Sequence, residues 1–311
     1  MTPQGSRPMK KLFPRTGLTR NTDLYLLLLP TVAYFLIFHY GPMIGLQIAF
    51  KDYRPLDGFW LSPWVGLKHF ERFLRSYQFV RLIYNTLSLS VYQIVVGFPL
   101  PILFALALNQ VQHRRYKQTV QTVSYAPHFI STVVMVGLTL VFLSRSNGLV
   151  NQLLVALGFE PVFFMGNARY FQSVYVLTGV WQHTGWSSII YLATLSSIDP
   201  QLHEAAIVDG ASRMQRILKI DIPSIVPTIV VILILSVGRA MSVGFEKAFL
   251  LQTPLNLARS EIIATYVYKV GLISGQFSFS TAVGLFNSVI NLMLLYVVNR
   301  IARSVSGSGL W

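Results

Sequence analysis

Long apolar segments are the feature that most constrains this chain of 311 residues. Hydropathy predicts six of them, at residues 24–49, 82–108, 119–143, 172–198, 224–250 and 279–299. Each has about 20 or more mainly apolar residues, the length that an α-helix needs to cross the hydrocarbon core of a bilayer. Strand-like alternation is absent, so helices rather than a barrel satisfy the backbone hydrogen bonds. The sequence therefore predicts an all-α, polytopic bundle of six transmembrane helices.

Composition agrees with a membrane protein and argues against a soluble one. Hydrophobic residues make up 53% of the chain and charged residues 12%, and the mean hydropathy is positive. A net charge of +14 would suggest nucleic acid as the partner of a soluble protein. In a membrane protein an excess of lysine and arginine marks the cytoplasmic segments instead. We therefore expect no nucleic-acid partner.

The chain has no cysteine, which excludes disulfides and Cys-ligated metals.

Basic residues indicate the topology. They precede the first span, which places the N-terminus in the cytoplasm, and six spans return the C-terminus to that side. We expect a multi-pass protein of the bacterial cytoplasmic (inner) membrane, with an N-terminal segment at 1–23, a membrane domain at 24–303 and a cytoplasmic tail at 304–311. The first outer segment is also basic, so the bias is modest. The cations assigned to the cytoplasm are Arg7, Lys10, Lys11, Arg15, Arg20, Arg114, Arg115, Lys117, Arg213, Arg216, Lys219, Arg300 and Arg303.

A charged insert, EAAIVDGASRMQRILKIDIP, lies at residues 204–223 between the fourth and fifth spans. Asp199 is a candidate N-cap before Pro200, a residue favoured at the first position of a helix. Gly210 permits a reversal that residues with a Cβ resist. A second helical segment follows, and Pro223 is expected to end it and to begin the next span. The insert therefore predicts two short helices that stand out from the bilayer; the alternative is a solvated basic loop.

The spacing of this insert resembles the EAA coupling loop of permease subunits in binding-protein-dependent ABC importers. Glu-Ala-Ala is followed by three residues, Gly210, nine residues and Ile-x-Ile-Pro, with Ile222 where the usual pattern has leucine. The resemblance implies that this loop, within residues 199–223, receives force from an ATPase, and that Glu204 pairs with an arginine or backbone donor there. The residues assigned to coupling are Glu204, Ala205, Ala206, Asp209, Gly210, Arg213, Ile220 and Pro223.

Two more stretches, at residues 181–206 and 264–286, resemble permeases of carbohydrate importers. The branch for complex oligosaccharides, with importers of alginate and pectin fragments, is the most similar. The family implies a type I ABC importer permease fold, in which spans two to six form the core and the first helix packs on a partner permease. It also implies a second homologous permease, a homodimeric or heterodimeric ATPase, an extracytoplasmic solute-binding protein and an oligosaccharide substrate.

The chain itself has no recognisable catalytic device. It lacks a G-x-x-x-x-G-K-[ST] phosphate loop, and its six histidines have no metal-type spacing. We therefore expect a transport subunit without a bound cofactor, with ATP and Mg on the ATPase. The alternative from another class is a self-sufficient secondary transporter, which would need coupling ions and usually internal repeats. Neither is detectable in the sequence.

Charged residues in the fifth span are candidates for the substrate path. Arg239, Glu246 and Lys247 fall in or near its outer half, and burial of a charge in a bilayer costs at least about 2.5–3.5 kcal/mol, so such groups usually face a bundle interior or water. On a continuous helix Arg239 and Glu246 would share one face. The two cations suit an acidic sugar such as a uronate oligomer, with neutral oligosaccharides as the alternative. Two alternatives account for charged residues in this span: a structural ion pair with another span, or a Lys247 side chain that reaches to the outer surface.

Polar and aromatic residues in other spans extend this candidate path. In the fourth span Gln182 and Trp186, one helical turn apart, are candidates for a carbohydrate contact. The alternative is that Trp181 and Trp186 belong to the outer aromatic belt. In the sixth span Asn287 is a path group or joins two helices. Prolines at 99, 101 and 127 are expected to kink the second and third spans.

Overall fold

The computed structural model describes residues 22–306 and residue 309. The predicted N-terminal segment up to residue 21, with its five cations, and half of the predicted tail lie outside the described residues. Throughout the described part the secondary structure is helical, apart from an isolated bridge between Lys51 and Trp64. The chain divides into two compact units, Met1–Ile48 and Ala49–Trp311.

The first unit is a helix of membrane-spanning length. It comprises α2 (Thr22–Phe35), a π-helical turn (Leu36–Tyr40), α3 (Gly41–Met43) and the start of a 3-10 segment (Ile44–Phe50). The stretch Leu24–Phe50 has 27 residues and is long and apolar enough to cross a bilayer. Most of its large apolar side chains are exposed within the chain, so they need an apolar environment such as lipid or another protein.

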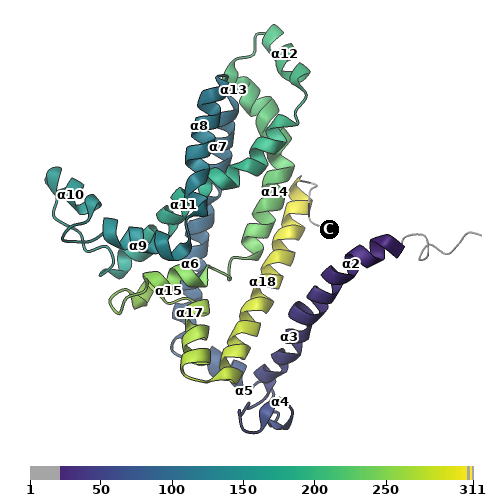
Figure 1. The fold of residues 1–311 in the computed structure, drawn as a ribbon, viewed down its shortest axis with the longest axis vertical. Helices are drawn as coiled ribbons and strands as arrows, with labels where there is room; N and C mark the ends of the chain where they lie inside the picture. Colours follow the sequence, from purple (N-terminus) through teal and green to yellow (C-terminus); the bar gives the residue numbers. More distant parts are fainter. Residues whose placement is uncertain (1–21, 307–308, 310–311) are drawn as a thin grey trace, which may run out of the picture. The chain divides into compact units, whose positions relative to one another are not determined.

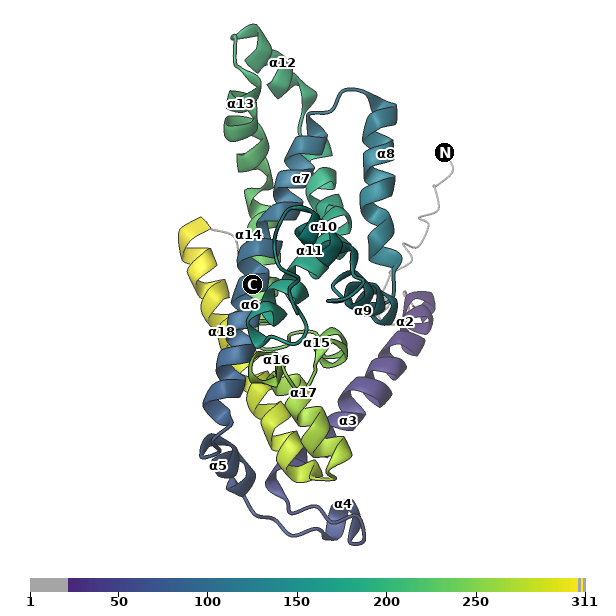
Figure 2. The ribbon, with the colours of Figure 1, turned by 90° about the vertical axis from the view of Figure 1, so that its left-hand side faces the viewer.

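The second unit is a bundle of long helices joined by short ones (Figure 1). Within it α11 packs against α7 and α6, and α14 packs against α18. The loop that carries α12 lies at one end of this unit, and α5 and α17 lie at the other (Figures 1 and 2). Its helices are α4 (Gly58–Leu61), α5 (Lys68–Leu74), α6 (Phe79–Gly97), α7 (Pro99–Asn109), α8 (Arg114–Tyr125), α9 (Thr132–Phe142), α10 (Leu149–Ala156), α11 (Ala168–Ser196), α12 (Pro200–Val208), α13 (Arg213–Arg216), α14 (Ile222–Gly238), α15 (Phe245–Leu251), α16 (Leu257–Ser260), α17 (Ile263–Tyr268) and α18 (Phe277–Ser306).

The helix lengths are roughly consistent with six spans. Among the described residues four helices are long and apolar enough to cross a bilayer, and a bent pair is a candidate fifth. Besides the first unit these are Phe79–Asn109, Arg213–Gly238 and Phe277–Ser304, which cover the predicted second, fifth and sixth spans. The predicted fourth span coincides with α11, which has 29 residues but a more polar composition. The fold is thus the predicted all-α membrane bundle.

The predicted third span is not one straight helix. Arg114–Phe129 and Thr132–Phe142 meet at an angle of 99°. The break follows Pro127, where a kink was expected, and Ser131 begins the new direction by capping α9 through a 3.4 Å hydrogen bond from the Val134 amide. A serine N-cap and a proline one turn earlier together explain why the chain turns here rather than continuing.

The prediction of a continuous fifth span over 224–250 is wrong. Helix α14 ends at Gly238, residues 239–244 are irregular, and α15 begins at Phe245. The freed backbone is stabilised from α18, because Oδ1 of Asn291 accepts a 2.9 Å hydrogen bond from the Met241 amide. Because the helix is interrupted, Arg239 and Glu246 do not share a helix face.

Three apolar clusters hold the second unit together. One near the α12 end includes Leu106 of α7, Leu195 of α11 and Ile225 of α14. A second centres on Phe171 and Tyr175 of α11, and a third joins α5, α6, α17 and α18. These clusters fix α7, α11 and α14 relative to one another, and both sites described next are built on these helices.

Candidate functional site

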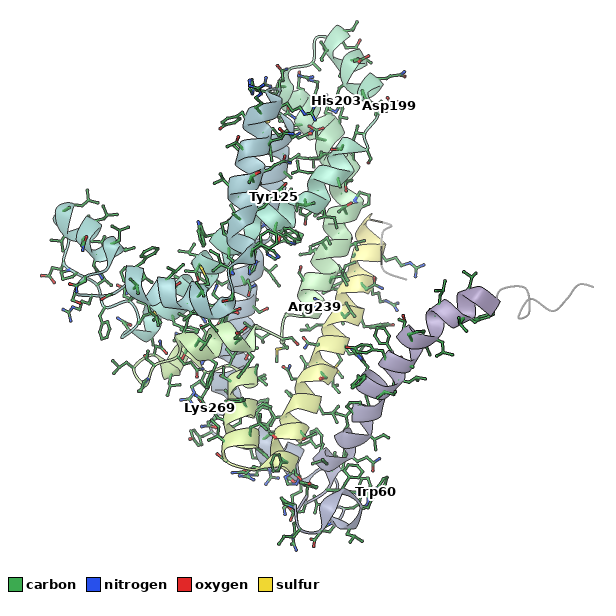
Figure 3. All side chains as sticks on the ribbon, viewed as in Figure 1. Trp60, Tyr125, Asp199, His203, Arg239 and Lys269 are labelled. Atoms are coloured by element: carbon green, nitrogen blue, oxygen red, sulfur yellow. The ribbon has the colours of Figure 1, made fainter. Side chains whose placement is uncertain are left out.

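The charged loop at residues 199–223 contains the predicted short helix α12, and its second helical segment is the start of the long helix Arg213–Gly238. Asp199 caps α12, since its Oδ1 accepts a 3.0 Å hydrogen bond from the Gln201 amide, and Pro200 occupies the first helical turn. Figure 3 places Asp199 and His203 at one end of the second unit and Arg239 near its middle. The local signals for the start of α12 are therefore confirmed.

Gly210 makes the reversal between α12 and α13. Its φ is +77°, in the left-handed region that residues with a Cβ avoid. The Gly210 amide donates to the Ile207 carbonyl at 3.0 Å, and the Ala211 amide donates to the Ala206 carbonyl at 2.8 Å. These two bonds form a Schellman motif, which satisfies carbonyls that would otherwise lack a donor at the end of α12.

The loop presents most of the predicted coupling residues to the outside. Within the chain α12 contains no buried residue. The second helical segment begins with a reciprocal capping box between Ser212 and Gln215. Of the residues predicted for coupling, Glu204, Ala205, Asp209, Gly210, Arg213 and Pro223 are exposed, whereas Ala206 and Ile220 are half-buried. This surface is accessible to a partner protein.

Pro223 does not end a helix, which corrects the prediction. A π-helical turn at Ile217–Asp221 joins α13 to α14, so that Arg213–Gly238 is one continuous helix of 26 residues. The Ile222 amide bonds to the Ile217 carbonyl, five residues back. Proline lacks an amide hydrogen and its ring collides with the carbonyl four residues earlier in an α-helix, so the wider turn accommodates it.

A buried carboxylate under the loop was not singled out by the sequence analysis. Asp221 is completely buried at the junction with α14. Its Oδ2 accepts a 3.0 Å hydrogen bond from Nε2 of Gln110, and its Oδ1 lies 3.3 Å from Nε2 of His203. We refer to Asp221, Gln110 and His203 as the Asp221 cluster. An aspartate within the apolar run that leads into a span was the available signal, because such a residue requires donors from elsewhere in the fold.

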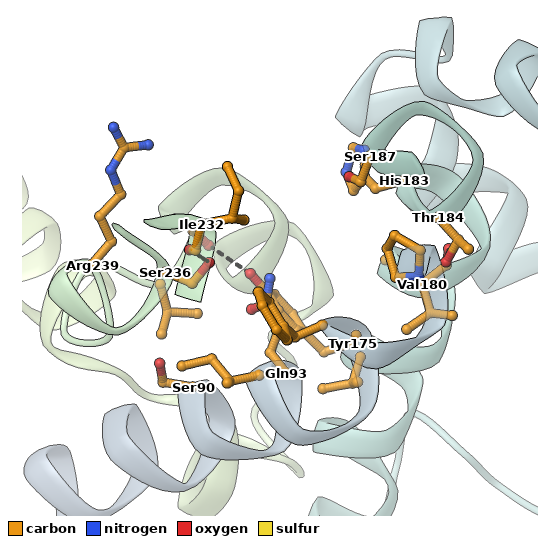
Figure 4. Close-up of a pocket in the computed structure, with 18 of the residues that line it drawn as sticks. Ser90, Gln93, Tyr175, Val180, His183, Thr184, Ser187, Ile232, Ser236 and Arg239 are labelled. Atoms are coloured by element: carbon orange, nitrogen blue, oxygen red, sulfur yellow. Dashed lines mark hydrogen bonds between the residues drawn. The ribbon is translucent and has the colours of Figure 1, made fainter. Parts of the chain in front are cut away.

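A second candidate site is a cavity of about 390 Å³ inside the second unit. It is lined by parts of α6, α7, α11, α14 and α15 and by the irregular segment between the last two. Figure 4 shows Arg239 on one side and His183 and Ser187 on the other, with Gln93 and Tyr175 between them. The polar and charged lining residues are Ser90, Gln93, Tyr175, His183, Thr184, Ser187, Tyr191, Ser236, Arg239, Ser242 and Lys247.

The cavity brings together two of the three charged residues predicted for the fifth span. Arg239 is exposed, and its guanidinium has no hydrogen bond or ion pair with any described residue. Lys247 is half-buried, and its Nζ donates to the Tyr175 carbonyl at 2.8 Å and lies 4.8 Å from the centre of the Tyr175 ring. Glu246 is exposed and does not line the cavity. The guanidinium of Arg239 is thus the free cation of this site.

The remaining predicted path residues lie outside this cavity. Gln182 is buried and donates from Nε2 to the Ile130 carbonyl at 2.8 Å, which holds the bend before α9. Trp186 stacks on His128, with ring centroids 4.4 Å apart and planes 2° from parallel. Asn287 is half-buried, and its Oδ1 has no hydrogen-bond partner among the described residues.

Several lining residues with a regular spacing were not predicted from the sequence. Ser90, Gln93, Gly97 and Pro101 recur every three or four residues along α6 and α7, and Tyr175, Gly179 and His183 recur every four residues on α11. Residues with these spacings share a helix face. Small and polar residues repeated on one face of an apolar helix were therefore the signal that could have identified the cavity.

The chain is similar to known transport proteins over almost its whole length. The family model described as "Binding-protein-dependent transport system inner membrane component" matches residues 97–307. Protein LplB of Bacillus subtilis (strain 168) is 43% identical over 295 residues, which cover 95% of this chain and 93% of LplB. The polygalacturonan/rhamnogalacturonan transport system permease protein YteP of the same organism is 46% identical over 288 residues, which cover 93% of this chain and 90% of YteP.

Solved structures show the same similarity. The crystal structure of a bacterial ABC transporter involved in the import of the acidic polysaccharide alginate contains a chain with a TM-score of 0.86 and 43% identity, covering 93% of this chain and 98% of that one. A bacterial alginate ABC transporter in complex with an alginate pentasaccharide-bound periplasmic protein gives a TM-score of 0.87 at 42% identity. The chain therefore belongs to the family of inner membrane components of binding-protein-dependent transport systems, and it is a transport subunit rather than an enzyme.

Proposed function

We propose that this chain is the permease subunit of an ATP-driven importer of oligosaccharides, and that its substrates are acidic. The observation that carries the substrate class is the charge of the cavity. Its lining includes Arg239, Lys247 and His183 but no aspartate or glutamate. A cation that has no protein partner at a cavity favours an anionic ligand, and a guanidinium binds a carboxylate through two parallel hydrogen bonds. The similarity to the alginate transporter structures supports the same substrate class.

The charged loop at residues 199–223 is proposed to dock on the ATPase at the cytoplasmic face. Its surface combines the exposed carboxylate of Glu204 with the exposed guanidinium of Arg213. The basic start of α8, with Arg114, Arg115 and Lys117, lies toward the same end of the second unit (Figure 2). That common position agrees with a cytoplasmic assignment for both segments and, by the number of spans, for both termini.

The proposed complex contains four kinds of partner besides the bilayer. A second homologous permease completes the transport path, and a dimeric ATPase binds ATP and Mg. An extracytoplasmic binding protein delivers the oligosaccharide. Closure of the ATPase dimer on ATP moves the docked loops, and the permease pair changes from an inward-facing to an outward-facing state. Uptake then requires that the loop and the cavity-lining helices move together.

The substrate class is tested by Arg239→Gln in the complete complex, reconstituted in proteoliposomes with its partner permease, ATPase and binding protein. Uptake of a uronate oligomer and of a neutral oligosaccharide of equal length is measured. Loss of one charge-assisted hydrogen bond is expected to lower acidic uptake about tenfold and to leave neutral uptake nearly unchanged.

Arg115→Gln is the matched control, because Arg115 is exposed on α8 and does not line the cavity. It removes the same charge and should leave the ratio of acidic to neutral uptake at the wild-type value. An equal loss of both substrates in Arg239→Gln would make Arg239 a structural residue. A wild-type complex that prefers the neutral sugar would refute the acidic assignment.

A further inference from the structure

The Asp221 cluster joins three parts of the chain that are far apart in sequence. Gln110 is the C-cap of α7, His203 lies in the middle of α12, and Asp221 ends the π-helical turn before α14. Oδ2 of Asp221 accepts a 3.0 Å hydrogen bond from Gln110, whereas Oδ1 lies 3.3 Å from Nε2 of His203 and has no hydrogen-bond partner among the described residues. Arg216 also lies close enough to exert an attractive charge, but its buried Nε has no hydrogen-bond partner among the described residues.

Helix α12 has few other attachments. None of its residues is buried, and it does not pack extensively on any other helix of the second unit. In Figure 1 it stands away from the bundle formed by α7, α11 and α14. Among the described residues, the polar side-chain contact that links α12 to this bundle is the one between His203 and Asp221. A helix held mainly by its two chain ends and one such contact can change orientation when that contact is lost.

We propose that His203 and Asp221 are positioning residues that fix the orientation of α12 relative to α7 and α14. Asp221 is completely buried and its Oδ1 has no hydrogen-bond partner among the described residues, so loss of the 3.3 Å contact with the His203 imidazole would leave the carboxylate still less compensated. We therefore expect the contact to persist through movements of the loop. Displacement of α12 by a partner is then transferred to the helices that line the cavity. The transfer role rests on the proposed function; the orientation of α12 can be measured independently of transport.

The orientation is tested with spin labels on the purified complex. The chain has no cysteine, so Gln201→Cys on α12 and Leu218→Cys before α14 give two unique, exposed label sites. We expect a single narrow distance distribution without nucleotide and a narrow one with ATP. His203→Ala should broaden both distributions. His203→Gln should restore narrow ones, because the glutamine amide also presents a donor to Oδ1 of Asp221.

Two further variants separate the contact from a general effect of the loop. Asp221→Asn keeps the volume of the side chain but removes the carboxylate, and it should broaden the distributions as His203→Ala does. Asp199→Asn removes a carboxylate from the same loop while keeping an N-cap residue, so it should leave them narrow. Wild-type distributions in both His203→Ala and Asp221→Asn would overturn the proposal.

Transport gives the second readout, as sugar taken up per ATP hydrolysed in proteoliposomes. His203→Ala should lower this ratio about tenfold while hydrolysis continues, and the double variant His203→Ala/Asp221→Asn should be no worse than the poorer single one. Independent, multiplying effects of the two substitutions would contradict a shared contact. If wild type transports no oligosaccharide, the proposed function fails, yet the distance measurements still decide whether the contact holds α12.

Discussion

Replacement of Gly210 by valine tests whether the turn between α12 and α13 transmits force. At Gly210 the backbone has a φ of +77°, and a Cβ built there meets no atom within 4 Å. The penalty is therefore conformational rather than steric contact with neighbours. For a residue with a Cβ the left-handed region costs about 1–2 kcal/mol, and a β-branched residue lies at or above the top of that range. A cost of about 2 kcal/mol reduces the population of the native turn by about thirtyfold relative to alternatives.

The assay is uptake by the reconstituted complex, with membrane insertion and ATPase co-purification measured on the same samples. Gly210→Val should lower uptake by at least about tenfold while insertion persists, since the substitution lies outside the spans. Gly210→Asn is the matched control, because asparagine adopts the left-handed region more readily than other residues with a Cβ, and it should retain most of the activity. Near-normal uptake by Gly210→Val would refute the claim that this turn transmits force.

Three other substitutions probe the loop, the cavity and the core. Glu204→Lys reverses an exposed charge on α12 and should weaken ATPase association or uncouple ATP hydrolysis from uptake. If loaded binding protein still stimulates hydrolysis normally, Glu204 has no coupling role. Lys247→Met removes a donor already bound to the Tyr175 carbonyl, so acidic and neutral uptake should fall equally; selective loss of acidic uptake would show that Lys247 contacts substrate. Asn85→Leu removes the amide that donates 3.0 Å hydrogen bonds to the backbone carbonyls of residues 258 and 261. It should destabilise the protein by about 2 kcal/mol in thermal unfolding in detergent. An unchanged melting temperature would contradict this expectation.

The charged loop was predictable because its signals are local. Asp199 before Pro200 marks a helix start, and Gly210 marks a left-handed turn. Each of these two features is determined by residues next to it in the sequence. The break after Gly238 was not predictable in the same way. Gly238 and Gly244 weaken the helix there and Arg239 interrupts the apolar run. The group that satisfies the freed Met241 amide, however, is Asn291, fifty residues later on α18.

The candidate path was predicted only in part for a related reason. Arg239 and Lys247 were identified from the cost of charge in a span, and the structure places both at the cavity. Gln182 and Trp186 were chosen as a helical pair suited to sugars. Their side chains instead bind the Ile130 carbonyl and stack on His128, which are long-range contacts that spacing along one helix does not reveal.

The π-helical turn before Pro223 has a mechanical consequence. A proline at the membrane boundary would ordinarily introduce a hinge, but the wider turn keeps Arg213–Gly238 continuous. Those 26 residues form a rod about 39 Å long, and Arg239 of the cavity wall follows directly at its far end. A tilt of about 10° about one end of such a rod displaces the other by about 7 Å, more than the length of one helical turn. A small rotation at the surface thus produces a displacement of several ångströms beside the cavity, carried along one continuous helix.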